Sequence, residues 1–137
     1  MKKYIVAFGI TSTLLLGAFI PQNTYASTVV HTQESNLIEI SQKYIGVPYK
    51  YGGATPSGFD CSGFLQFVLA KAGISIPRTT EQLYNSSDLE KISSLKPGDL
   101  VFFATTKKTA SHVGMFIGND KFIHSSSSKG VSISGMG

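Results

Sequence analysis

Apolar residues recur at helical spacing in the first half of the chain. Between residues 36 and 45 they return every three or four positions, and a glycine and a proline follow. The same spacing returns in a longer stretch that starts at Cys61, with Asp60 in the N-cap position and Gly73 just past the end. A shorter helix is predicted over residues 80–85. Cys61 is therefore predicted to lie in the first turn of a buried helix.

The second half of the chain alternates β-prone runs with turn signals. The runs cover residues 100–104, 112–117, 121–124 and 131–134. Gly118-Asn119-Asp120 is expected to join two of them in a hairpin. Helices followed by an antiparallel meander predict an α+β domain, with the helices packed on the sheet.

The first residues have the pattern of an export signal. A short basic start precedes an almost uncharged apolar run, and a small residue at Ala26 suits a cleavage site. The alternatives are a membrane-spanning helix or a lipid anchor, but the apolar run is short for a bilayer and no cysteine follows it. We predict a signal peptide over residues 1–26, a short linker over 27–35 and one domain over 36–137.

Composition limits the classes of partner. Removal of residues 1–26 from the 137 leaves 111, enough for one small domain. The two lysines of the signal leave with it, so the formal net charge falls from +4 to +2. A charge this small, on scattered basic residues, argues against nucleic acid as a partner. We expect no stable membrane association after cleavage, whereas the oligomeric state is not predictable.

The chain has one cysteine, which cannot form a disulfide within the chain. An odd thiol in an exported protein indicates either a disulfide-linked dimer or a reactive group. A thiol attacks as its thiolate, and the unpaired N–H groups of a first helical turn stabilise negative charge and a developing oxyanion. Cys61 is therefore a candidate nucleophile.

Three histidines are candidates for the base. His31 lies in the predicted linker and is the weakest of them. His112 begins one strand of the predicted hairpin and His124 ends the other, so the two should lie side by side. This arrangement suggests that Cys61 attacks, that His112 takes and returns the proton, and that His124 orients the His112 ring.

Two other interpretations of these residues remain open. A small cysteine on an amphipathic helix is commonly a core residue, and a histidine at a strand end is commonly just exposed. A zinc site of one cysteine and two histidines would need the same convergence, without any paired short-range ligand motif. We expect no metal and no cofactor.

Five ordered motifs go beyond generic patterns. They are Gly46-Val47-Pro48-Tyr49-Lys50-Tyr51-Gly52-Gly53, Phe59-Asp60-Cys61-Ser62-Gly63-Phe64, Leu95-Lys96-Pro97-Gly98-Asp99-Leu100-Val101-Phe102-Phe103, Ser111-His112-Val113-Gly114-Met115-Phe116-Ile117-Gly118 and Phe122-Ile123-His124-Ser125. Together they closely resemble the NlpC family of bacterial cell-wall cysteine endopeptidases, from about Ile38 to the C terminus.

The resemblance implies a papain-like α+β fold and a secreted enzyme, extracellular or in a bacterial cell wall. It implies cleavage of peptidoglycan stem peptides between D-γ-glutamate and the diamino acid, diaminopimelate or lysine. In the family's motifs Cys61 matches the nucleophile, His112 the base and His124 the third polar residue. Tyr49 matches a tyrosine expected beside the nucleophile, where its hydroxyl could assist the oxyanion or the substrate.

Four further residues are expected to contact the substrate. Asp60 and Ser62 match positions that line the groove of relatives; Asp60 would meet a substrate amine, or else simply cap the helix. Arg78 would bind a substrate carboxylate, with a surface ion pair as its alternative. Ser111 is expected to orient the loop before His112.

The sequence departs from the family in two respects. Relatives commonly carry wall-binding repeats, for which this chain has no room, and they usually continue past residue 137 into a further strand. The catalytic domain is therefore expected either to be shortened at its C terminus or to have a sheet with an unprotected edge. Rival functions are a cell-wall amidase or acyltransferase with the same three residues, and a catalytically silent wall-binding module. The diamino acid, the stem length and the physiological role are not predictable.

Overall fold

The computed structural model describes residues 3–7, 35–87, 89–105 and 110–137. Two helices precede most of the sheet: a first helix over residues 35–42 and α2, Cys61–Lys71. A one-turn helix, α3, covers Thr80–Tyr84. The first helix ends three residues earlier than its apolar pattern predicts, because residues 43–46 form turns that lead into Pro48.

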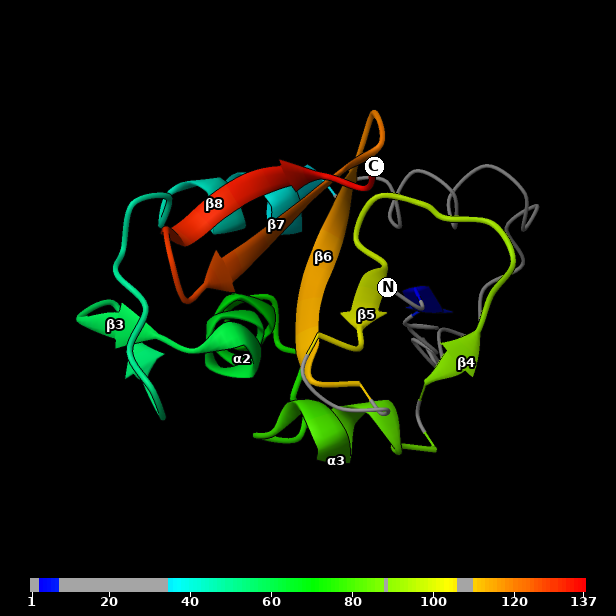
Figure 1. The fold of residues 1–137 in the computed structure, drawn as a ribbon, viewed down its shortest axis with the longest axis horizontal. Helices are drawn as coiled ribbons and strands as arrows, with labels where there is room; N and C mark the ends of the chain where they lie inside the picture. Colours follow the sequence, from blue (N-terminus) through cyan, green and yellow to red (C-terminus); the bar gives the residue numbers. More distant parts are fainter. Residues whose placement is uncertain (1–2, 8–34, 88, 106–109) are drawn as a thin grey trace, which may run out of the picture.

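Most strands form one antiparallel sheet (Figure 1). Within the described residues it has six strands in the order β4-β1-β5-β6-β7-β8. Their bounds are β1 Lys3–Ala7, β4 Glu90–Lys91, β5 Leu100–Phe103, β6 His112–Gly118, β7 Lys121–Ser126 and β8 Gly130–Gly135. The four predicted strands are confirmed as β5 to β8, and the α+β class is confirmed with them.

The predicted hairpin between β6 and β7 is confirmed, and its turn has a local cause. Asn119 and Asp120 both have positive φ, 51° and 57°, which is the conformation of a tight two-residue turn that matches the twist of the strands. Asparagine and aspartate tolerate that conformation better than most residues. The sequence therefore fixes where β6 ends and β7 begins.

A second, two-stranded sheet was not predicted. It consists of β2, Ala54–Thr55, and β3, Gly58–Phe59. The chain enters α2 directly from β3, and Tyr49 forms an isolated parallel bridge with Phe59. This small sheet therefore holds the Tyr49 segment next to the start of α2, to the side of the main sheet in Figure 1.

The core lies mainly between the helices and the main sheet. Phe64, Leu65 and Val68 of α2 are fully buried in a cluster that includes Val113 of β6 and Ile123 of β7. Alternate residues of the strands face the other way, and three of them, together with Met136 just after β8, form a second buried cluster: Val101, Phe103, Phe122 and Met136. The helix that carries Cys61 therefore packs on β6 and β7, the strands that carry His112 and His124.

The strand β1 lies where the sequence predicted an export signal. It pairs with β5 from Lys3↔Phe103 to Val6↔Leu100, and also with β4. Most of the predicted signal and linker, together with His31, lies outside the described residues. The division into signal, linker and domain stays a prediction.

Candidate active site

Cys61 is the first residue of α2, as predicted. Asp60 is the N-cap in extended conformation, with φ −84° and ψ −179°, and its Oδ1 accepts a hydrogen bond from the Gly63 N–H at 2.7 Å. The cap leaves the other first-turn amides without helical partners, which favours negative charge nearby. The half-buried thiol is free of any disulfide. Its environment is therefore the one expected for a nucleophile at a helix N-terminus.

The thiol has a hydrogen-bond partner that the sequence did not indicate. Cys61 Sγ lies 3.3 Å from Oγ1 of Thr80, which is the first residue of α3 and is 8% exposed. The only feature that the sequence offered for Thr80 was its place at the start of a predicted helix. No hydrogen bond joins the thiol to His112 within the described part of the chain.

His112 and His124 are brought together by the hairpin. His112 Nε2 lies 2.7 Å from His124 Nδ1, and the ring centroids are 5.0 Å apart. They are not directly opposite each other: a Cβ added at Gly114 would be 3.2 Å from the Cβ of His124. The rings meet diagonally across the ladder, beside a glycine that leaves room for them.

The rings lie on the face of the sheet that carries the second buried cluster. The His112 ring is 6.1 Å from that of Phe103, and the His124 ring is 4.5 Å from that of Phe122. His124 is only 8% exposed, and His112 is half-buried at the first position of β6.

Burial keeps both imidazoles neutral at neutral pH. Desolvation, followed by repulsion from a protonated His124, lowers the pKa of His112 to about 4. Desolvation, followed by the positive charge of Lys129, also lowers the pKa of His124. Because Nε2 of His112 is engaged with His124, its Nδ1 is the nitrogen left to accept a proton.

A serine of β8 extends the pair of histidines. His124 Nε2 lies 2.9 Å from Oγ of Ser134. The sequence indicates no role for this residue, because the contact depends on the register between β7 and β8. In that register His124 is paired with Ser132, and Phe122 with Ser134.

Asp60, Ser62 and Arg78 form one polar cluster at the start of α2. Arg78 donates from Nη1 to Asp60 Oδ1 at 3.0 Å and from Nη2 to Oδ2 at 2.9 Å. It also donates to Ser62 Oγ and to the Gly53 carbonyl, at 3.2 and 3.3 Å. Helix capping by Asp60 and an ion pair with Arg78 are thus both observed. Contacts of the three with substrate stay predictions.

Tyr49 lies near the same cluster. Its pKa is raised, first by desolvation and then by the negative charges that Cys61 and Asp60 can carry. The hydroxyl therefore stays protonated at neutral pH and can donate a hydrogen bond. That this hydroxyl assists the oxyanion or the substrate remains a prediction.

Ser111 anchors the loop before His112. Its Oγ accepts a hydrogen bond from the Thr105 N–H at 2.8 Å and donates to the Phe103 carbonyl at 3.4 Å. These bonds join the end of β5 to the start of β6. They suit the expected role in orienting His112, whereas a contact with substrate is untested.

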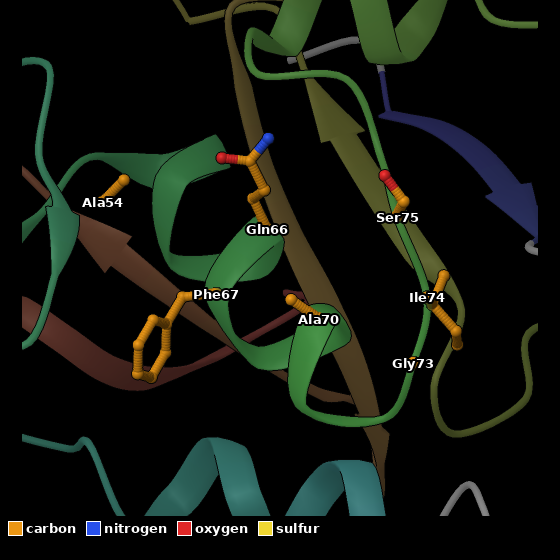
Figure 2. Close-up of a pocket in the computed structure, with 7 residues that line it drawn as sticks. All are labelled: Ala54, Gln66, Phe67, Ala70, Gly73, Ile74 and Ser75. Atoms are coloured by element: carbon orange, nitrogen blue, oxygen red, sulfur yellow. The ribbon is translucent and has the colours of Figure 1, made fainter.

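A separate pocket of about 490 Å³ lies along the outer side of α2. Figure 2 shows its lining by Gln66, Phe67 and Ala70 of the helix and by the loop over residues 73–75. None of the predicted site residues lines it. It is therefore distinct from the candidate active site.

Metal-binding groups and membrane-spanning helices are both absent from the described ranges. No group of three His, Cys, Asp or Glu side chains there is arranged to hold a metal ion. No helix among these residues is long and apolar enough to cross a membrane.

The sequence model of the NlpC/P60 family matches residues 46–137. Among curated relatives, the gamma-DL-glutamyl hydrolase of Bacillus subtilis is 45% identical over 106 residues, which are 75% of this chain and 26% of that protein. The probable peptidoglycan endopeptidase LytE of the same organism is 48% identical over 102 residues, 74% of this chain and 30% of the relative. The chain thus spans less than a third of the length of either.

Solved structures show the same fold. The NlpC/p60 domain of the peptidoglycan hydrolase SagA has a TM-score of 0.64 and 32% identity, over 75% of this chain and 89% of that chain. An NlpC/P60 family protein from Bacillus cereus has a TM-score of 0.68 and 34% identity, over 75% of this chain and 35% of that one.

Proposed function

The chain belongs to the NlpC/P60 family, and from that premise we propose that it is a cell-wall cysteine endopeptidase. Its substrate would be a peptidoglycan stem peptide, cut between D-γ-glutamate and the diamino acid. Relatives are named as a peptidoglycan endopeptidase and a gamma-DL-glutamyl hydrolase, which supports this substrate class. The observations that carry the proposal are the 2.7 Å pair of His112 and His124 and the free thiol at the N-terminus of α2, the helix that packs on the other face of the same strands.

In the acylation step, the Cys61 thiol gives its proton to Nδ1 of His112, and the sulfur attacks the carbonyl carbon of the scissile bond. The negative charge that develops on the carbonyl oxygen is stabilised by amides of the first turn of α2 and by the protonated hydroxyl of Tyr49. When the C–N bond breaks, His112 returns its proton to the leaving amine. A thioester to Cys61 remains.

In the second step, water gives a proton to His112 and attacks the thioester carbonyl. The C–S bond breaks, the thiolate regains its proton from His112, and the acid product leaves. This sequence needs a hydrogen bond between Cys61 and His112 in the substrate complex. Catalytic hydrogen bonds of this kind often tighten only when substrate is bound.

The site would act outside the membrane, because the stem peptides of peptidoglycan lie there. The basic and apolar start of the sequence supports export. Asp60 and Arg78 would face the peptide only as a pair, because both oxygens of the Asp60 carboxylate already accept from Arg78.

The test is digestion of purified muropeptides by the chain and by its Cys61→Ala variant, with products identified by mass spectrometry. We expect a new D-γ-glutamyl terminus with the parent chain, and a loss of at least about 1000-fold in rate with Cys61→Ala, since removal of a catalytic nucleophile can cost about 10⁶-fold. Circular dichroism of both proteins controls for folding. Equal turnover by the two would contradict the role of Cys61, and product masses with a different new terminus would point to an amidase or acyltransferase.

A further inference from the structure

His124 is hydrogen-bonded at both ring nitrogens. Its Nδ1 meets His112 Nε2 at 2.7 Å, and its Nε2 meets Ser134 Oγ at 2.9 Å. The three side chains come from three neighbouring strands, β6, β7 and β8. Ser134 reaches the ring because it is the diagonal neighbour of His124 across the β7–β8 ladder.

The protons on this chain of groups are coupled. For His112 to accept a proton at Nδ1, its own proton must sit on Nε2, so Nδ1 of His124 must be an acceptor. A neutral His124 then carries its proton on Nε2 and donates it to Ser134 Oγ. If His124 Nδ1 instead donated to His112 Nε2, the proton of a neutral His112 would sit on Nδ1. His112 could then not accept a proton from the thiol.

We propose that Ser134 is a positioning residue that holds the His124 ring in the orientation in which its Nδ1 accepts from His112 Nε2, and so keeps His112 Nδ1 free as a base. This inference rests on the proposed function, and it concerns the outer partner of an orienting histidine rather than any group that touches the substrate. Partners on the outer ring nitrogen orient the imidazole in histidine relays and in metal sites alike.

A purely structural role makes a different prediction. If Ser134 only satisfies a buried ring nitrogen, its loss would lower stability and leave the rate of the folded protein unchanged. If it positions His124, its loss also lowers kcat. KM is unchanged in that case, because the stem peptide does not touch Ser134.

Two replacements of equal shape separate these roles. Ser134→Thr keeps the hydroxyl, whereas Ser134→Val removes it, and both side chains suit a strand. In the full chain we expect kcat on muropeptides to fall about tenfold with Ser134→Val, the rate equivalent of one hydrogen bond. Ser134→Thr should stay within about threefold of the parent, and KM should be unchanged in both.

Ser132→Ala is the matched control. Ser132 is on the same strand and is paired with His124, but its Oγ donates to the Gly130 carbonyl at 3.3 Å and not to the ring. We expect the parent kcat from this variant. Equal kcat for Ser134→Val and Ser134→Thr would overturn the inference.

The ¹⁵N chemical shifts of the His124 ring give a readout that does not need activity. In the parent and in Ser134→Thr we expect a protonated Nε2 and an unprotonated Nδ1, and in Ser134→Val a mixture of the two tautomers. The same single tautomer in all three would also overturn the inference. If the parent chain fails to cleave muropeptides, the proposed function fails, while the ring shifts still decide the role of Ser134.

Discussion

At the scale of single residues, the neutral state of His112 makes stability depend on pH. Its pKa in the folded chain is about 4 because the ring is desolvated and lies beside His124, whereas an exposed histidine has a pKa near 6.5. Between these values the unfolded chain binds a proton that the folded chain does not. Stability from this group is therefore complete above pH 6.5 and is lost as the pH falls toward 4.

We expect the free energy of unfolding to fall by roughly 3 kcal/mol more between pH 7 and pH 4 in the parent than in His112→Gln. Urea titrations at a series of pH values measure this difference. Desolvation also lowers the pKa of His124. Its contribution to the pH dependence of stability has the same direction, and it remains in the variant. Parallel pH dependence in the two proteins would contradict a buried neutral His112.

At the scale of elements, the contact between the rings depends on how closely β6 and β7 approach. A Cβ at Gly114 would lie 2.7 Å from a ring carbon of Phe122 and 3.0 Å from the carbonyl oxygen of Ile123. The backbone atom cannot move without shifting β7, so Gly114→Ala must displace His124 relative to His112. Overpacking of this kind typically costs about 1–3 kcal/mol.

For Gly114→Ala we therefore expect a lower melting temperature and a fall in kcat of at least about tenfold, since misplacing a catalytic group by a fraction of an ångström is costly. Gly135→Ala is the control, because its added Cβ would meet only one atom, 4.0 Å away. Calorimetry and muropeptide turnover measure the two effects. If the two variants behave alike, the close approach at Gly114 does not matter.

The elements also show where prediction from sequence succeeds and where it stops. The bounds of α2, its cap at Asp60 and the turn after Gly118 follow from local rules, since each depends on residues within four positions. The Asp60–Arg78 ion pair spans 18 positions and the Cys61–Thr80 contact 19, and no local rule reaches that far. Ser134 depends on strand register, which the hydrophobic pattern of β8 constrains only to a choice of face.

At the scale of the whole molecule, the sheet and the predicted export signal make competing demands on residues 3–7. As β1 they cover the edge of β5 over four paired positions, whereas export would remove them. A bare edge at β5 would lose those ladder hydrogen bonds and could pair with another chain. The contribution of β1 can be tested because cleavage at the predicted site, after Ala26, removes β1 and leaves β5 in the chain.

We expect the free energy of unfolding of residues 27–137 to be lower than that of the full chain by about 2 kcal/mol or more. Each ladder hydrogen bond lost with β1 contributes about 0.5–1.5 kcal/mol. Urea titration of both chains measures the difference, and light scattering detects association through the bare edge. A variant of the full chain with Val6→Pro serves as control, because proline cannot donate to the ladder and should weaken β1 without shortening the chain. If both altered chains match the parent in stability, β1 contributes nothing to the fold, and removal of residues 1–26 on export would not weaken the domain.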